Sequence, residues 1–209
     1  NAVSEIGIEA GKQVVGIAVA PSFERLDISG NQIRKPKPVS DTTDTWEALL
    51  VQAGQDKKFW LDLNRFPFFV TLPRLAISTG SNIVGINIPS LASVPRGAET
   101  IGVDGNLFES PGGAYAARVV VGGSCTFSNN RCIQPSMRAT PAVRLEAGAL
   151  LITNNYVEGH KGSAGMTVKI PDVSGRHALT VVGNICTTDI KVNGSDLDSR
   201  WKGVNVLAE

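Results

Sequence analysis

A short motif recurs along the chain at intervals of about 25 residues, and this repeat constrains the fold more than any other feature. Each copy runs apolar, variable, apolar, small or polar, Gly or Asn, Asn, variable, apolar, and the copies begin at positions 26, 101, 125, 150 and 179. Asn82 fills a missing step 24 residues before Asn106. The asparagines of the repeat are Asn31, Asn82, Asn106, Asn130, Asn155 and Asn184.

The alternation of apolar residues within each copy is that of a β-strand, and the repeat carries no helical stripe. A second short apolar segment lies between most of the motifs, separated from them by Gly, Pro and Ser turns. A period of this length with strand alternation predicts one coil of a stacked β-structure per repeat. The sequence therefore predicts an all-β, single-stranded parallel β-helix over residues 1–209, right-handed by the general rule for parallel crossovers.

Because identical motif positions stack in successive coils, the motif predicts which residues point inward and which lie at the bend. The first, third and eighth residues of the motif are apolar in the five aligned copies and should point inward. Asparagines in successive coils should stack about 4.8 Å apart, each amide donating to one coil and accepting from another. The residue before each asparagine should take the left-handed conformation of a tight bend, which suits Gly and Asn. Its occupants are Gly30, Gly105, Asn129, Asn154 and Gly183.

The three cysteines, Cys125, Cys132 and Cys186, all fall on inward positions. Cys132 and Cys186 share a column but are separated by Val157, so strand spacing places them about 9.6 Å apart, beyond disulfide reach. We therefore expect three reduced, buried thiols. Such thiols are compatible with the cytoplasm and can also persist on a surface or in a secreted protein, so the compartment stays open.

The motifs Ser128-Asn129-Asn130, Thr153-Asn154-Asn155 and Gly183-Asn184 resemble those of the right-handed parallel β-helix, or pectate-lyase-like, superfamily. Residues 101–209 also resemble the C-terminal ends of large, mostly uncharacterised bacterial β-helix proteins. The resemblance implies a fold more than an activity. It further implies that this chain continues N-terminally in a longer protein.

Residues 34–74 interrupt the repeat and are expected to form a short helical and aromatic insertion. Ser and Asp residues before Trp46–Val51 offer helix caps, and an aromatic cluster follows. The first interpretation is that this segment packs over the barrel or covers an open edge. The alternative is a ligand groove in which Trp46 or Trp60 stacks on a sugar ring while Asp62 and Arg65 bind its hydroxyls.

Residues 187–209 are expected to form a C-terminal cap, because the end of a solenoid exposes its core and strand edges unless something covers them. Asn193-Gly194 is a strong turn dipeptide. Four apolar side chains are available to cover the last coil, namely Leu197, Trp201, Val204 and Val206.

Composition disfavours several partners and cofactors. The chain has 20 basic and 19 acidic residues, so no strong overall field attracts nucleic acid or an anionic membrane. No apolar run approaches the length of about 18 residues that a membrane span needs. No zinc, hydrolase-elbow or phosphate-loop motif is present, so we expect neither a metal nor another cofactor. The middle coils carry four arginines, which form a solubilising face or bind an acidic glycan or a partner protein: Arg118, Arg131, Arg138 and Arg144.

Catalysis on this fold would need carboxylates that converge on one outer face. Only Asp27 and Asp104 are acidic among the outward motif positions, and Asp62 is a third candidate from the insertion. A glycosidase pair needs two carboxyls roughly 5–10 Å apart. The sequence therefore favours a non-catalytic structural or binding module for adhesion, surface display or a tail-like assembly. The alternative is a carbohydrate-active enzyme, either a polysaccharide lyase or a glycoside hydrolase.

Overall fold

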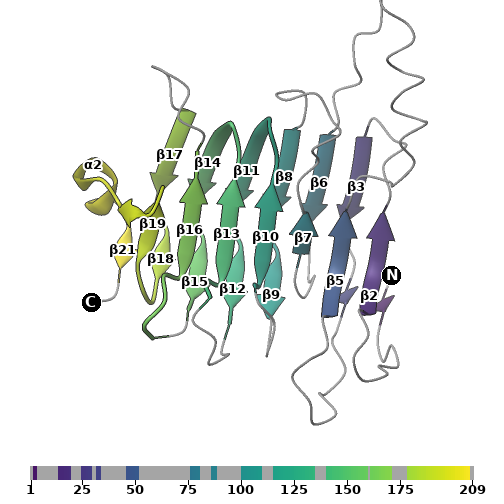
Figure 1. Cartoon of the computed structure of the whole chain (residues 1–209). Helices are drawn as coiled ribbons and strands as arrows, with labels where there is room; N and C mark the ends of the chain where they lie inside the picture. The colour runs from purple at the N-terminus through teal and green to yellow at the C-terminus, as the bar shows by residue number, and fades with distance from the viewer. Residues whose placement is uncertain are drawn as a thin grey trace, which may run out of the picture.

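The computed structural model describes twelve stretches of the chain: residues 2–3, 14–19, 25–29, 32–33, 46–51, 76–80, 86–88, 100–109, 115–134, 140–159, 161–170 and 178–207. Their regular secondary structure is almost entirely β-strand, and the strands stack side by side along one axis (Figure 1). Within them, α2 (Ser199–Lys202) is the single helix. No helix in these stretches is long and apolar enough to cross a membrane.

The strands form three long sheets, which we call sheets I, II and III, and a short pair between β1 (Ala2–Val3) and β4 (Gln32–Ile33). Sheet I contains β2 (Val14–Val19), β5 (Trp46–Val51), β7 (Ile86–Ile88), β10 (Ala117–Val120), β13 (Val143–Glu146), β16 (Met166–Lys169), β19 (Ile190–Val192) and β20 (Ser195–Asp196). Sheet II contains β3 (Arg25–Ser29), β6 (Ala76–Gly80), β8 (Thr100–Asp104), β11 (Ser124–Ser128), β14 (Ala149–Thr153) and β17 (Ala178–Val182). Sheet III contains β9 (Leu107–Glu109), β12 (Arg131–Ile133), β15 (Tyr156–Glu158), β18 (Ile185–Cys186) and β21 (Val206–Leu207).

The strands pair as a parallel β-helix. From residue 100 onward each coil supplies one strand to sheet II, then one to sheet III, then one to sheet I. Equivalent motif positions are directly opposite one another: Cys125 pairs with Ile101 on one side and with Leu150 on the other. Every pairing between coils is parallel among the described strands, and only β19 and β20 pair antiparallel. The predicted β-helix of about 25 residues per coil is therefore confirmed.

The interior consists of the inward motif positions. Ile101, Val103 and Phe108 are fully buried, and the rings of Phe108 and Phe127 stack with their centroids 6.4 Å apart. Outward residues between them are half-buried or exposed, which gives each strand the alternation expected from its sequence. Leu179, in the last strand of sheet II, is only partly buried, because no further strand of that sheet lies beyond it.

The expectation of a helix at Trp46–Val51 is wrong, because these residues form strand β5. β5 lies between β2 and β7 in sheet I, with Val14 opposite Trp46 and Leu49 opposite Ile86. Parallel pairing on both sides outweighs the helix-capping signals upstream, which act only locally. The coil thus runs through the segment that the sequence assigned to an insertion. The other binding candidates there, Trp60, Asp62 and Arg65, lie outside the described residues.

Residues 187–207, the described part of the expected cap, lie at the C-terminal end of the stacked coils (Figure 1). β19 and β20 form a hairpin across Asn193 and Gly194, whose φ angles of 49° and 83° match the predicted turn. Leu197 is buried and Trp201 packs against the core.

Two of the four apolar residues assigned to the cap do not cover the core. Val204 and Val206 are 47% and 63% exposed, so their predicted role is wrong. Val206 belongs to β21, which adds a strand to sheet III beside β18, and it lies opposite the exposed Ile185. The alternation of the strand therefore places Val206 on the outer face and turns its neighbour Leu207 toward the core.

Candidate functional site

A column of buried asparagines joins sheets II and III and holds the coils in register. The backbone N–H and the side-chain amide of Asn106 both donate to Oδ1 of Asn130, each over 3.0 Å. Asn130 makes the same two bonds to Asn155 (2.9 and 3.0 Å), and Asn155 makes them to Asn184 (3.0 and 2.8 Å). The predicted asparagine ladder is thus confirmed across these coils. Asn31 and Asn82 lie outside the described residues.

The amides of Asn130, Asn155 and Asn184 also donate to the preceding coil, so each of these side chains links three coils. Nδ2 of Asn130 donates to the carbonyl of Val103, and Nδ2 of Asn155 donates to that of Phe127, both over 2.9 Å. These buried amides therefore satisfy the backbone as well as one another, which removes the desolvation cost of placing polar groups in the core.

Asn205 is a further rung that the sequence interpretation missed. Its Oδ1 accepts two hydrogen bonds of 2.9 Å from Asn184, and its Nδ2 donates to the carbonyls of Val181 and Trp201. Only the ending of the motif is matched, by Asn205 and the apolar Leu207, and the spacing of 21 residues from Asn184 is shorter than the others. Asn205 fastens the C-terminal segment onto the last coil.

The bend before Asn106, Asn130, Asn155 and Asn184 has the predicted left-handed backbone. Gly105, Asn129, Asn154 and Gly183 have φ angles of 65°, 54°, 56° and 71°. Asp104, one of the acidic candidates, serves this bend: its Oδ1 accepts hydrogen bonds from Oγ of Ser128 (2.7 Å) and Nδ2 of Asn129 (2.8 Å). The carboxylate of Asp104 therefore ties one coil to the next.

Two of the acidic candidates lie on sheet II. Asp27 in β3 lies opposite Ser78 in β6, which in turn lies opposite Gly102 in β8. Both Asp27 and Asp104 are exposed. Two strand spacings and an offset of two residues place their Cα atoms about 12 Å apart. Asp62 lies outside the described residues.

The three cysteines are free and buried, as predicted. Burial raises the pKa of Cys125 and of Cys186 from 9.0 to about 12, and it raises that of Cys132 well above the ordinary range. Removal from water disfavours the thiolate, so these side chains behave as small apolar groups at neutral pH.

Thiol reactivity tests this placement. We expect a thiol-specific reagent at neutral pH to label none of the three cysteines in the folded protein and all three after denaturation. Because folding raises these pKa values, the stability from neutral thiols is fully present below pH 9.0 and is lost as the pH rises toward about 12. Rapid labelling of any cysteine under native conditions, with the circular dichroism spectrum intact, would contradict the inward column.

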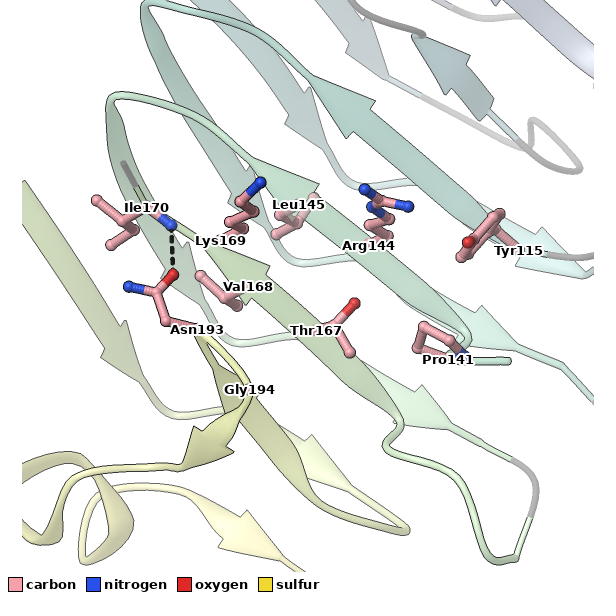
Figure 2. A pocket seen from close by; sticks show the side chains of 10 residues that line it. All are labelled: Tyr115, Pro141, Arg144, Leu145, Thr167, Val168, Lys169, Ile170, Asn193 and Gly194. Atoms are coloured by element: carbon pink, nitrogen blue, oxygen red, sulfur yellow. Dashed lines mark hydrogen bonds between the residues drawn. The ribbon is translucent and has the colours of Figure 1, made fainter. Parts of the chain in front are cut away.

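The outer face of sheet I carries an open groove of about 700 Å³ near the C-terminal end (Figure 2). Its polar side chains come from successive strands: Arg144 from β13, and Thr167 and Lys169 from β16. Tyr115, just before β10, borders the groove, and the turn at Asn193 and Gly194 closes the other side. The groove therefore presents one aromatic ring together with several hydrogen-bonding groups on a rigid sheet.

Ion pairs and a hydrogen bond order the charged groups in this groove. Glu146 lies 3.5 Å from Arg144 and 3.5 Å from Lys169. A hydrogen bond with the hydroxyl of Tyr115 raises the pKa of Arg144 further, so the guanidinium stays charged at every relevant pH. Asn193 uses its Oδ1 to accept from the backbone N–H of Ile170 (Figure 2).

The four arginines of the middle coils do not share one face. Arg118 and Arg144 are direct neighbours in sheet I. Arg131 lies in sheet III, where its guanidinium carbon is 5.4 Å from the ring centroid of Tyr156. Arg138 lies outside the described residues. The sequence indicated the basic character of these coils, but the assignment of each arginine to a sheet required the register.

Within the described stretches, no three His, Cys, Asp or Glu side chains gather in a way that could hold a metal ion. Comparison with known proteins adds no relative: no family model, no curated protein and no solved structure matches this chain.

Proposed function

We propose that this chain is a non-catalytic structural module that binds a glycan on the outer face of sheet I. We also propose that it is the C-terminal part of a longer bacterial protein of the pectate-lyase-like, right-handed β-helix type, in which it serves adhesion, surface display or a tail-like assembly. The observation that carries the binding proposal is the groove of Tyr115, Arg144, Thr167 and Lys169 on a rigid sheet.

The chemistry of the groove suits a sugar. An aromatic ring provides a flat apolar surface for a sugar face, while Arg, Lys, Thr and Asn side chains hydrogen-bond hydroxyl groups. Parallel strands about 4.8 Å apart hold these groups at fixed spacings, so little ordering is needed when a ligand binds. A repetitive, extended ligand would match a repetitive face.

A glycan array followed by titration with the best ligand tests the proposal. We expect Tyr115→Ala to weaken binding roughly tenfold, about 1.4 kcal/mol, because the stacking surface is lost. The chain has two tyrosines, and Tyr156 lies on the outer face of sheet III, so Tyr156→Ala is the matched control and should leave affinity unchanged. Equal effects of both variants, or no binding to any glycan, would overturn the proposal.

The same ligands should be tested for turnover. A non-catalytic module releases no new reducing ends from a glycan that it binds. Release that is abolished by Asp27→Asn or Asp104→Asn would instead support the alternative of a carbohydrate-active enzyme that uses the outer face of sheet II.

A further inference from the structure

Two arginines lie side by side on the outer face of sheet I, and one of them, Arg144, lines the groove. Arg118 in β10 is directly opposite Arg144 in β13. Their neighbours Ala117, Val119, Val143 and Leu145 are fully buried, so both arginines project from the outer face of sheet I. Strand spacing places the two side chains about 4.8 Å apart at their bases. Like charges directly opposite in a sheet destabilise it unless an anion offsets them.

The two arginines differ in their partners. Arg144 is held by Glu146 and by the hydroxyl of Tyr115. Arg118 has neither an ion pair nor a hydrogen bond from its side chain to any described residue, and its Nε is buried without a partner. A buried donor of a charged group that makes no hydrogen bond carries a substantial desolvation cost. Arg118 is therefore an outward-facing arginine whose Nε has no partner among the described residues.

The charge around this pair is also one-sided. The outward residues of β10, β13 and β16 include three cations, Arg118, Arg144 and Lys169, and one carboxylate, Glu146. Glu146 is already shared between Arg144 and Lys169. The outward positions of these three strands thus carry two more cations than carboxylates. A planar guanidinium fork binds the paired oxygens of a carboxylate or sulfate group with two parallel hydrogen bonds.

We propose that Arg118 and Arg144 together bind one anionic group, a carboxylate or a sulfate, of a glycan that lies across the strands of sheet I. This inference rests on the proposed glycan-binding function and names the ligand class: acidic rather than neutral polysaccharides. Arg144 is oriented by Tyr115 and Glu146 and supplies one side of the site. Arg118 supplies guanidinium N–H groups that have no partner among the described residues. The sugar rings extend from the bound anionic group into the groove.

Isothermal titration with three oligosaccharides of similar length tests the proposal: a uronic acid oligomer, a sulfated oligomer and a neutral oligomer. The variant is Arg118→Gln, which keeps most of the side-chain length and removes the charge. Arg131→Gln, on sheet III, is the matched control because it changes the net charge equally. We expect Arg118→Gln to weaken binding of one acidic oligomer roughly 10- to 100-fold, with neutral binding and the control unchanged. Arg118→Lys should restore little, since a lysine lacks the fork.

The outcomes distinguish the paired-arginine anion site from the proposed glycan binding on which it rests. If the neutral oligomer binds as tightly as the acidic ones and Arg118→Gln changes nothing, the anion site is wrong while glycan binding stands. If no oligomer binds, both proposals fail. If Arg131→Gln weakens acidic binding as much as Arg118→Gln, the effect is general charge attraction and the paired-arginine site is overturned. A preference for the sulfated or the uronic acid oligomer identifies the anionic group. An unchanged thermal unfolding curve for each variant establishes that the fold is intact.

Discussion

Replacing Asn155 with alanine is expected to destabilise the protein by about 3–5 kcal/mol, because it removes the middle of the ladder. Asn130 loses the acceptor for its backbone N–H and its side-chain amide. Asn184 loses the side-chain donor to its Oδ1 and keeps the backbone donor of residue 155, and the carbonyl of Phe127 loses its partner. All of these groups are buried between coils, so water cannot replace the bonds. Urea unfolding of the variant and the wild type measures the loss.

The adjacent residue provides the control. Asn154 is exposed, has a φ angle of 56° and makes no side-chain hydrogen bond with a described residue. Asn154→Gly keeps the left-handed bend and should change stability by well under 1 kcal/mol. A small effect of Asn155→Ala, comparable to that of Asn154→Gly, would mean that the ladder does not hold the coils together.

The substitution Gly148→Ala is expected to cost about 2–3 kcal/mol for a steric reason. A Cβ atom at this position would lie 2.6 Å from the backbone oxygen of Gly122 and 3.1 Å from that of Gly123. Both oxygens belong to the preceding coil, and Gly123 accepts a hydrogen bond from the N–H of Ala149. The backbone would have to separate two coils to make room. Thermal unfolding compared with the wild type measures this effect.

Gly203 is the matched glycine. It lies at the end of α2 with a φ angle of −73°, and a Cβ atom there would meet nothing within 4 Å. Gly203→Ala should therefore leave the unfolding temperature within about 1–2 °C of the wild type. If Gly148→Ala also leaves the unfolding temperature unchanged, the coils do not approach each other closely between sheets I and II.

Most of the fold could be predicted because a β-helix repeats the same local chemistry in every coil. One eight-residue motif was enough to assign the inward positions, the bends and the column of asparagines. The reduced cysteines followed from the same alignment, since Val157 separates Cys132 from Cys186 in their shared column.

The errors fall where the repeat weakens. Cap residues before Trp46–Val51 favour a helix there, whereas pairing with β2 and β7 decides its conformation. Hydrophobicity alone assigns Val204 and Val206 to the core, although the alternation of β21 places Val206 outside. Asn205 escapes the repeat because its coil is shorter. In each case contacts distant in sequence outweigh a local signal.

The candidate site could not be predicted from the sequence, because it depends on which outward residues become neighbours. Tyr115, Arg144 and Lys169 lie on different coils, and no short motif contains them. The proximity of Arg118 to Arg144 follows only from the register of β10 and β13. A repeated motif predicts the interior of a solenoid well, whereas its outer faces vary from coil to coil.

Solution NMR provides the most direct test of the central claim, that a stacked asparagine column holds parallel coils in register. We expect contacts between the side chains of Phe127 and Ile152, and between those of Ile152 and Val181, as the pairing of β11, β14 and β17 requires. The side-chain amide protons of Asn130 and Asn155 should exchange with solvent slowly, because both are buried and bonded. Fast exchange of these amides, or contacts that pair the same strands antiparallel, would contradict the account.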